Sequence, residues 1–234
     1  MRFPTPLVPG RLIRRYKRFL ADIALEDGRE VTAHCPNPGA MLNFKEPGTR
    51  VWVEQNDDPK KKLKYGWRLV ELPWGAMAGI DTGVPNRVVG EALAEGRITE
   101  LADYPDIRAE VAYGKGSRVD FLVRGPGLSE AYVEVKNVNY RREDDWAEFP
   151  DCVTDRGAKH LIELAEMAER GHRAVLLYVV QRNDCARVKL APDLDPHYAR
   201  TAVEAVARGV EMMAYGTEIT PDGVRLTERL PFEL

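Results

Sequence analysis

Ser117 to Val123 has the sequence SRVDFLV, and Ala131 to Val138 has the sequence AYVEVKNV. Both stretches are rich in β-branched and aromatic residues, which is typical of strands. Arg124-Gly125-Pro126-Gly127 follows the first stretch, and its glycines and proline are typical of a turn. The sequence therefore predicts one hairpin made of two adjacent strands.

Three charged side chains converge on this hairpin. Folding it at the turn sets Asp120 near Glu134. Because side chains alternate along a strand, Glu134 and Lys136 point to one face and Val135 points to the other. Two carboxylates suit a hard cation, Mg²⁺ or Mn²⁺, and a lysine beside them could orient water or stabilise developing negative charge. The competing interpretation is a solvated hairpin face that carries an ordinary Glu/Lys cross-pair.

The segments around the hairpin define an order of elements. Residues 85–96 predict a short helix that contains Glu91, and residues 107–113 predict a strand. After Lys136, residues 154–168 predict an amphipathic helix whose start carries Arg156, Lys159 and His160. Residues 173–182 form a nearly continuous apolar run, typical of a strand buried on both faces. The predicted core is αβββαβ.

This order, with an acid on the first helix, an acid on the second strand and acid-x-lysine on the third, resembles the PD-(D/E)XK nuclease-like superfamily. The resemblance implies catalytic roles for Glu91, Asp120, Glu134 and Lys136. It also implies that Asp120, Glu134 and the carbonyl of Val135 bind the metal. Val119 stands where the superfamily's name places proline.

Five longer stretches carry a second resemblance: Leu12 to Asp22, Thr32 to Met41, Ser117 to Phe121, Tyr132 to Val138, and Arg156 to Leu161. With these stretches in this order, the chain resembles the sugar fermentation stimulation protein A family nearly from end to end. The family is known as DNA-binding proteins connected with sugar (maltose) metabolism, with an OB-like domain before the nuclease-like one. Pro38 replaces the threonine expected in the family's HCPNTG stretch.

Composition indicates an ordinary globular protein. The 234 residues are 44% hydrophobic and 30% charged, which allows one large domain or two small ones. No apolar run approaches the length of a membrane span, and the first ten residues lack the apolar core of a signal peptide. Three widely spaced cysteines without a CxxC pair indicate neither a disulfide framework nor a zinc finger, so the predicted setting is the cytoplasm. His34 and Cys35 could bind a metal, but a structural turn is the favoured interpretation.

Charge is distributed unevenly along the chain. Residues 1–72 hold 14 Lys and Arg against 9 Asp and Glu, whereas the remaining residues hold 20 against 28. Positive charge interleaved with aromatic residues suits a surface that holds a phosphate backbone and stacks unpaired bases. Nucleic acid is therefore the predicted partner, and solvated basic loops are the alternative. The family resemblance implies DNA, single-stranded or double-stranded. The predicted nucleic-acid-binding residues are Arg14, Arg15, Lys17, Arg18, Lys60, Lys61, Lys62, Arg156 and Lys159.

The first third of the chain is predicted to be β-rich. Leu12 to Leu25 and Arg29 to Ala33 flank a hairpin signal at Asp27-Gly28, and Arg50 to Glu54 alternates as a third strand. We expect an α/β (mixed α+β) protein with an OB-like barrel over residues 1–80 and a nuclease-like αβββαβ domain with a mixed sheet over residues 81–234. Two functions agree with these patterns: a Mg²⁺-dependent nuclease that hydrolyses phosphodiesters, or a DNA-binding regulator of sugar metabolism genes that does not cleave. The sequence predicts no particular oligomeric state.

Overall fold

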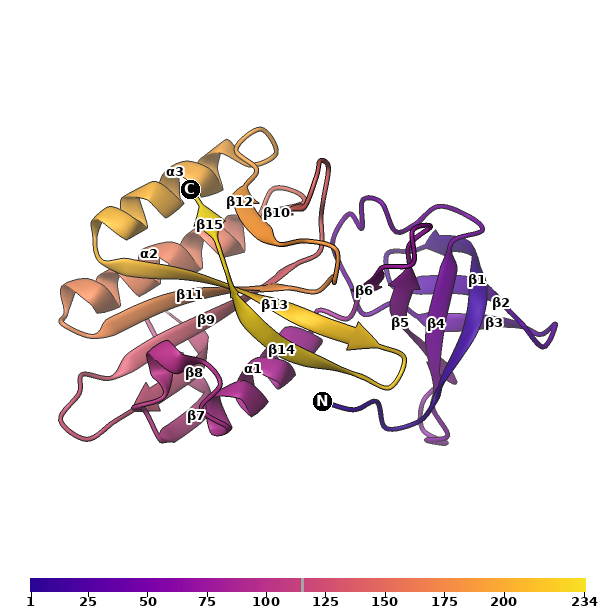
Figure 1. Cartoon of the computed structure of the whole chain (residues 1–234), viewed down its shortest axis with the longest axis horizontal. Coiled ribbons are helices and arrows are strands. Elements are labelled where there is room, and N and C mark those ends of the chain that lie inside the picture. The colour runs from indigo at the N-terminus through magenta and orange to yellow at the C-terminus, as the bar shows by residue number, and fades with distance from the viewer. Residues whose placement is uncertain (115) are drawn as a thin grey trace.

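The chain folds into a small β-barrel and a larger α/β domain that lie side by side. A computed structural model describes residues 1–114 and 116–234. Figure 1 shows the barrel, in indigo and purple, beside the α/β domain that the rest of the chain forms. No helix within these residues is long and apolar enough to cross a membrane.

The barrel is closed by one parallel pair of strands. Its strands are β1 (Leu7–Tyr16), β2 (Leu20–Leu25), β3 (Glu30–His34), β4 (Arg50–Gln55), β5 (Tyr65–Glu71) and β6 (Met77–Gly79), in the order β3-β2-β1-β4-β5-β6. β3 also pairs with β5, which joins the two sides of the sheet. Alternate residues such as Leu12, Ile23, Val53 and Trp67 fill the interior. Gly10 is required where β1 and β2 meet, because a Cβ there would lie 2.7 Å from the Ala24 carbonyl oxygen.

The predicted strand from Leu12 to Leu25 is wrong, because the structure breaks it into β1 and β2. Lys17 and Arg18 have φ angles of 47° and 64°, and they form the turn together with Phe19. Left-handed turns usually contain glycine or asparagine, and this one contains neither. The predicted hairpin at Asp27-Gly28 does form, with Gly28 at a φ of 88°.

A six-stranded mixed sheet forms the centre of the larger domain. Its order is β14-β13-β11-β9-β8-β7, in which β9, β11 and β13 are parallel and the outer pairs are antiparallel. The predicted order αβββαβ is present as α1, β7, β8, β9, α2 and β11. The bounds of the strands are β7 (Asp106–Tyr113), β8 (Ser117–Arg124), β9 (Ala131–Val138), β11 (Arg173–Val180), β13 (Val210–Thr220) and β14 (Gly223–Leu230).

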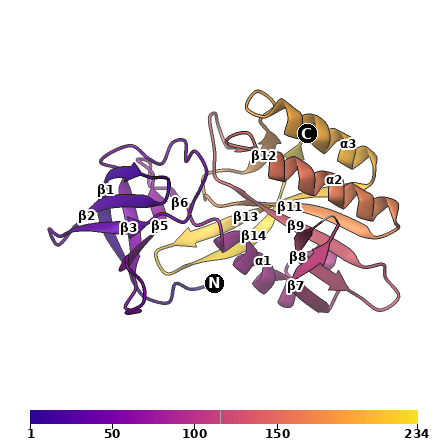
Figure 2. The ribbon, with the colours of Figure 1, turned by 180° about the vertical axis from the view of Figure 1, so that it is seen from behind.

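Helices cover both faces of this sheet, as Figure 2 shows from behind. α1 (Val84–Ala94) packs on one face, and α2 (Asp155–Glu169) and α3 (Pro196–Ala207) pack on the other. Thr154 caps α2 by accepting a hydrogen bond from the Gly157 N–H, and Asp195 caps α3 in the same way from Tyr198. From Ala174 onward every residue of β11 is buried, which confirms the prediction of a strand covered on both faces.

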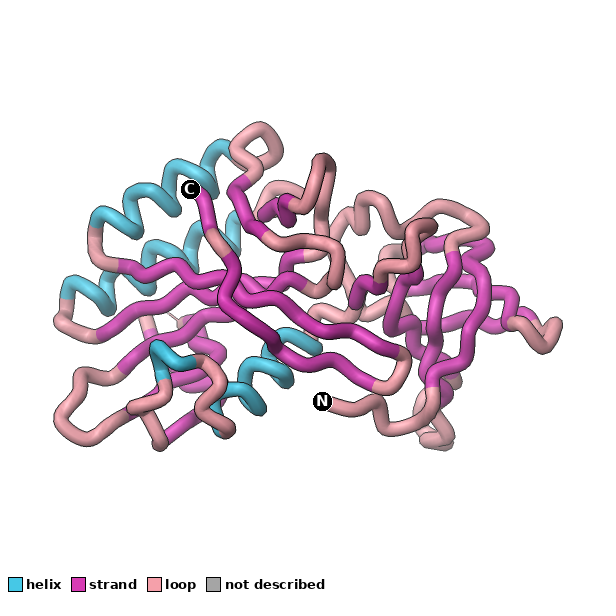
Figure 3. Tube along the Cα trace, in the orientation of Figure 1, coloured by secondary structure: helices cyan, strands magenta, loops and turns pink. Residues whose placement is uncertain are grey.

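A second, smaller sheet was not predicted. It contains the parallel strands β10 (Trp146–Phe149), β12 (Arg187–Leu190) and β15 (Phe232–Glu233), and it lies near α3 in Figure 3. One turn of 3₁₀ helix, η1 (Thr99–Leu101), precedes β7. These strands are too short to give a periodic signal, because two to four residues span at most two alternations.

Hydrogen bonds tie the barrel to the larger domain just after β11. The Gly79 N–H donates to the Gln181 carbonyl at 2.9 Å, and the Met77 N–H donates to Asn183 Oδ1 at 2.8 Å. Asp184 accepts from Trp74 of the barrel and from Arg182 and Arg141 of the larger domain. The first residues of the chain also reach the larger domain, where Arg2 forms a β-bridge with Gly223.

Candidate functional site

The β8–β9 hairpin opens at the two predicted acids. β8 and β9 pair at Phe121 with Val133, and the ladder ends there, so that Asp120 and Glu134 stand opposite one another as the next, unpaired positions. The β7–β8 ladder also skips the position of Asp120, opposite Glu110, whose φ is 56°. Left-handed backbone at a non-glycine residue is costly and concentrates at functional sites. At Asp120, strand pairing is thus interrupted both toward β7 and toward β9.

Asp120 is held by two hydrogen bonds from different elements. The Val135 N–H donates to Oδ2 at 2.7 Å, and Asn86 Nδ2 of α1 donates to Oδ1 at 2.6 Å. Burial, together with the negative charge of Glu134, raises the pKa of Asp120 above its usual range. A cation at this position would lower that pKa again, because it favours the ionised carboxylate.

Glu134 is buried, and its two oxygens have different surroundings. Oε1 accepts from Lys136 Nζ at 2.9 Å and pairs with His160 Nδ1. Burial alone would raise the pKa of Glu134, but the hydrogen bond from His160 and the charge of Lys136 hold it below its usual range. Oε2 is buried and has no hydrogen-bond partner among the described residues. An ionised carboxylate oxygen without a partner is costly unless a ligand completes it.

His160 joins this site from α2, and sequence analysis did not assign it a role there. Its Nε2 accepts from Arg156 Nε at 3.3 Å, and its Nδ1 faces Glu134 Oε1. The predicted contact of Arg156 with phosphate therefore has a competing partner inside the protein. The signal that could have identified His160 is its place one turn after Arg156 on the buried side of α2.

Tyr113 is a further unpredicted neighbour of the two acids. Its side chain is buried at the end of β7, and its hydroxyl has no hydrogen-bond partner among the described residues. Burial, together with the nearby charges of Glu134, Glu163 and Asp120, raises its pKa well above the usual value. The phenol therefore stays uncharged beside the two acids and can donate a hydrogen bond to a group bound there.

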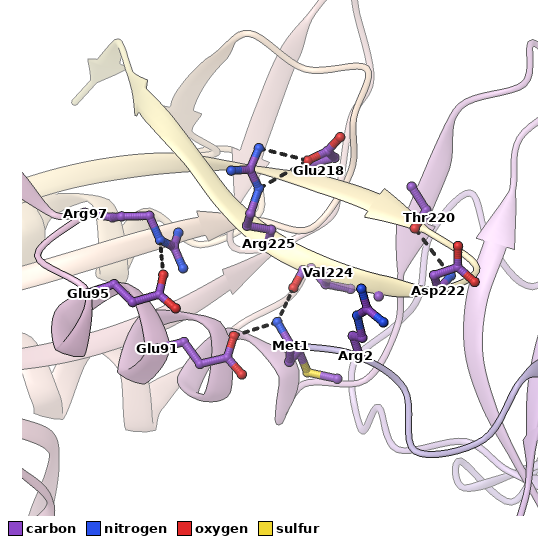
Figure 4. Close-up of a pocket in the computed structure, with 11 residues that line it drawn as sticks. Met1, Arg2, Glu91, Glu95, Arg97, Glu218, Thr220, Asp222, Val224 and Arg225 are labelled. Atoms are coloured by element: carbon purple, nitrogen blue, oxygen red, sulfur yellow. Dashed lines mark hydrogen bonds and ion pairs between the residues drawn. The ribbon is translucent and has the colours of Figure 1, made fainter.

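The structure does not bring Glu91 to the other predicted catalytic residues. Its Oε2 pairs with the Met1 amino group at 2.6 Å, and both residues line a cavity of about 620 Å³ beside β14. Figure 4 shows the Glu91 side chain directed toward Met1. Helix periodicity accounts for the position of Glu91, whose catalytic role stays a prediction. Residues advance by about 100° around an α-helix, so Glu91 lies about 140° away from Asn86, which faces Asp120. Asn86 is the residue that α1 contributes to the site.

The residues present suit a divalent cation that also binds substrate. No group of three or more His, Cys, Asp or Glu side chains is arranged as a ready metal cluster in the described part of the chain. The donors are the Asp120 carboxylate and the free Oε2 of Glu134, with the Val135 carbonyl still a prediction. Magnesium is commonly bound by one or two carboxylates and completes its shell with water and substrate phosphate. The donor set fits that pattern.

The basic residues at the end of β1 divide into structural and exposed ones. Arg15 is partly buried and donates to the carbonyls of Asn37 and Gly39, so it fixes the loop after β3. Arg14 is exposed, pairs with Asp22 at 2.8 Å and lies over the Tyr16 ring. Lys17 and Arg18 are exposed in the turn. Three of the four predicted cations there are therefore accessible to a phosphate backbone.

The β4–β5 loop presents Lys60, Lys61 and Lys62 to solvent. Tyr65 and Trp67, the aromatic residues that follow these lysines, are buried in the barrel core and offer no ring face to a base. Alternation along β5 places both rings inward.

The same loop also approaches the larger domain. Lys61, Arg68 and Arg87 line a cavity of about 380 Å³ between the barrel and α1. Arg87 directly follows Asn86, the α1 residue that contacts Asp120. Arg68 and Arg87 both pair with Asp81, and Glu54 and Asp57 line the same cavity, so its surface carries charges of both signs.

The start of α2 carries the last two predicted cations. Arg156 and Lys159 are both exposed in the first turns of the helix, and Lys159 Nζ lies 3.7 Å from Glu163. Helix amino termini attract anions, because their N–H groups point outward and carry partial positive charge. Arg156 contacts His160, so this helix start adjoins Glu134.

Comparison with known proteins agrees with this architecture. Residues 13–80 match the family model described as "SfsA N-terminal OB domain", and residues 83–223 match "Sugar fermentation stimulation protein RE domain". The sugar fermentation stimulation protein homolog of Dinoroseobacter shibae is 68% identical over 100% of this chain and 96% of its own length. The homolog of Jannaschia sp. is 66% identical over 100% of this chain and 97% of its own length.

A solved structure extends the comparison to three dimensions. "The structure of Pyrococcus Furiosus SfsA in complex with Ca2+" superposes with a TM-score of 0.90 at 28% identity, covering 100% of this chain and 98% of that one. The match includes both the barrel and the larger domain, in the same order along the chain. The chain belongs to the sugar fermentation stimulation protein family.

Proposed function

We propose that the protein is a divalent-metal-dependent nuclease that hydrolyses phosphodiesters in DNA. One observation carries the proposal. Asp120 and Glu134 face each other where the β8–β9 ladder opens, Lys136 contacts Glu134, and one buried Glu134 oxygen has no partner among the described residues. A cation bound between the two carboxylates would give that oxygen the partner it lacks.

Each residue has a role in this proposal. Asp120 and Glu134 Oε2 would hold a Mg²⁺ or Mn²⁺ ion. When bound, the cation polarises the phosphoryl oxygen and lowers the pKa of a coordinated water. Lys136 Nζ donates to Glu134 Oε1 and lies close enough to the acids to stabilise negative charge that develops at phosphorus. Asn86 and the Val135 N–H keep Asp120 in place.

The barrel would hold the DNA. Its exposed cations at Arg14, Lys17, Arg18 and the 60–62 loop neutralise phosphates, and Phe19, which is 44% exposed, offers an aromatic face for an unpaired base. Arg156 and Lys159 would contact the strand near the cleavage position.

A relative supports the metal part of the proposal. The Pyrococcus furiosus structure is described as a complex with Ca²⁺. Calcium and magnesium are both hard cations with oxygen ligands, so a site for one is a reasonable site for the other when its geometry is flexible.

The three cysteines of the present chain are free, which supports the proposed reducing cytoplasm.

A non-cleaving DNA-binding regulator is the second candidate, and one observation favours it. Glu91 is turned toward Met1, so the acid set has one member fewer than the superfamily resemblance implies. A site with two acids binds a cation more weakly than one with three, because each carboxylate contributes one negative charge. DNA binding without turnover is the expected behaviour if that loss is decisive.

One assay separates the two candidates. Purified protein is incubated with labelled single- and double-stranded DNA in the presence of Mg²⁺, Mn²⁺ or EDTA, and cleavage and binding are measured together. We expect metal-dependent cleavage by the wild type and by Glu91→Gln, and none by Asp120→Asn. Binding of DNA by all three proteins without any cleavage would establish the regulator, whereas cleavage by Asp120→Asn would place the active site elsewhere.

A further inference from the structure

We infer that His160 is a positioning residue that orients the Glu134 carboxylate toward the cation. The inference rests on the proposed metal-dependent function and adds to it a residue that lies outside the superfamily pattern. His160 and Glu134 are both buried, with 6% and 4% of their side chains exposed. Their contact joins α2 to β9, which are distant in sequence and come together only in the folded chain.

The protonation of the His160 ring follows from its two partners. Arginine has only donors, so the 3.3 Å contact from Arg156 Nε makes His160 Nε2 an acceptor. A carboxylate oxygen only accepts, so the Nδ1 that faces Glu134 Oε1 carries the proton of that contact. Arg156 therefore selects the tautomer, and the tautomer supplies the N–H that Glu134 accepts.

The carboxylate is held in one orientation by two donors on the same oxygen. His160 Nδ1–H and Lys136 Nζ both donate to Oε1, and their nitrogens are 3.4 Å apart. Rotation of the carboxylate would break both bonds. Oε2, which has no partner among the described residues, is consequently the oxygen of Glu134 left for a ligand. Partners that orient a ligating carboxylate in this way commonly contribute 10- to 100-fold to metal affinity, as an order of magnitude.

Two conservative substitutions test this geometry. The amide nitrogen of asparagine is separated from Cβ by the same number of bonds as His Nδ1, so His160→Asn keeps a donor toward Glu134. The amide nitrogen of glutamine corresponds to His Nε2, so His160→Gln places its donor away from Glu134. The two variants differ little in polarity and both remove the ring, so a role in packing alone predicts similar effects for both.

The experiment is a calorimetric titration of the full chain with Mn²⁺ alone. We expect His160→Gln to weaken binding by about 10- to 100-fold, and His160→Asn to stay within a few-fold of the wild type. His172→Gln is the matched control, because His172 lies 3.9 Å from Glu130 at a different place on the fold. Its affinity should equal that of the wild type. In cleavage assays His160→Gln should lower kcat and leave KM for DNA unchanged, because His160 orients Glu134 and does not bind the strand.

Several outcomes would overturn the inference. Equal weakening by His160→Asn and His160→Gln would show a packing role, and wild-type affinity in both would show no role. If either variant fails to fold by circular dichroism, nitrogen NMR of the wild-type imidazole decides, and a proton on Nε2 contradicts the tautomer. Wild-type protein that binds no Mn²⁺ and cleaves no DNA removes the proposed function and this inference together. Tight wild-type binding that His160→Gln leaves intact removes the inference alone.

Discussion

Replacing Asp184 by asparagine should destabilise the protein in a pH-dependent way. Asp184 accepts from Arg182 at 2.6 Å, from Arg141 at 2.6 Å and from Trp74 at 3.0 Å, so it links the barrel to the larger domain. Burial alone would raise its pKa, but Arg182 and Arg141 lower the pKa to about 2 from an ordinary value of 3.8. Its side chain is 10% exposed, so solvent screens these interactions only in part.

The magnitude and the pH range follow from that shift. A carboxyl with a depressed folded-state pKa stabilises the fold above its unfolded pKa and loses that contribution as the pH falls through the folded value. At pH 7 this amounts to about 2 kcal/mol, and about half remains near pH 3. Urea unfolding of wild type and Asp184→Asn at pH 7, 5 and 3 measures the difference directly.

The control is Asp145→Asn, which removes a half-exposed ion pair with Arg187. Exposed pairs of this kind contribute at most about 1 kcal/mol, so the control should change the free energy of unfolding less than Asp184→Asn does. A stability loss in Asp184→Asn that matched the control, or that was the same at pH 7 and pH 3, would refute the assigned role of the Arg182 and Arg141 contacts.

Three further predictions concern the site and the surface. Lys136→Ala should lower turnover by about two orders of magnitude and weaken Mn²⁺ binding by no more than about 10- to 100-fold, since the lysine stabilises developing charge and orients Glu134 without being a ligand; a fall in turnover no larger than the fall in metal affinity would contradict the charge role. Replacing Lys60, Lys61 and Lys62 together with alanine should reduce the log-log salt slope of single-strand binding by about 0.7 for each phosphate that the loop no longer neutralises, and an unchanged slope would remove the loop from the interface. In native protein, Cys152 should be the one thiol that reacts with an aromatic disulfide reagent, because burial raises the pKa of Cys185 to about 12 and Cys35 is fully buried; three fast-reacting thiols would show that the fold opens readily.

The elements that sequence analysis predicted correctly are those with strong local patterns. The bounds of β9 agree with the predicted strand, and β11 is buried along its length as its apolar run indicated. The β10-β12-β15 sheet was missed because its strands are short and pair in parallel across distant parts of the chain. The turn at Lys17 and Arg18 was missed because the chain adopts left-handed backbone there without a glycine.

The site was predictable to the extent that it is local. Asp120 and Glu134 belong to one hairpin, so turn position and alternation were enough to place them opposite each other. Which residue of α1 faces the site depends on how the helix is rotated about its axis relative to the sheet. No local sequence pattern determines that rotation. Glu91 was chosen by residue type, and the residue that faces Asp120 is Asn86. His160 likewise required knowledge of how α2 packs on β9.

The exchange of an expected acid for an amide changes the electrostatics of the proposed site. Asn86 donates a hydrogen bond to Asp120 and adds no charge, so Asp120 and Glu134 carry two negative charges beside the one positive charge of Lys136. The pKa of Asp120 is already raised by burial and by Glu134, and a third carboxylate would raise it further and favour its protonated form. An amide at that position therefore avoids a further rise in the pKa of Asp120. The cost is a weaker attraction for the cation, which a phosphate of bound DNA would offset by contributing its own negative charge to the same metal.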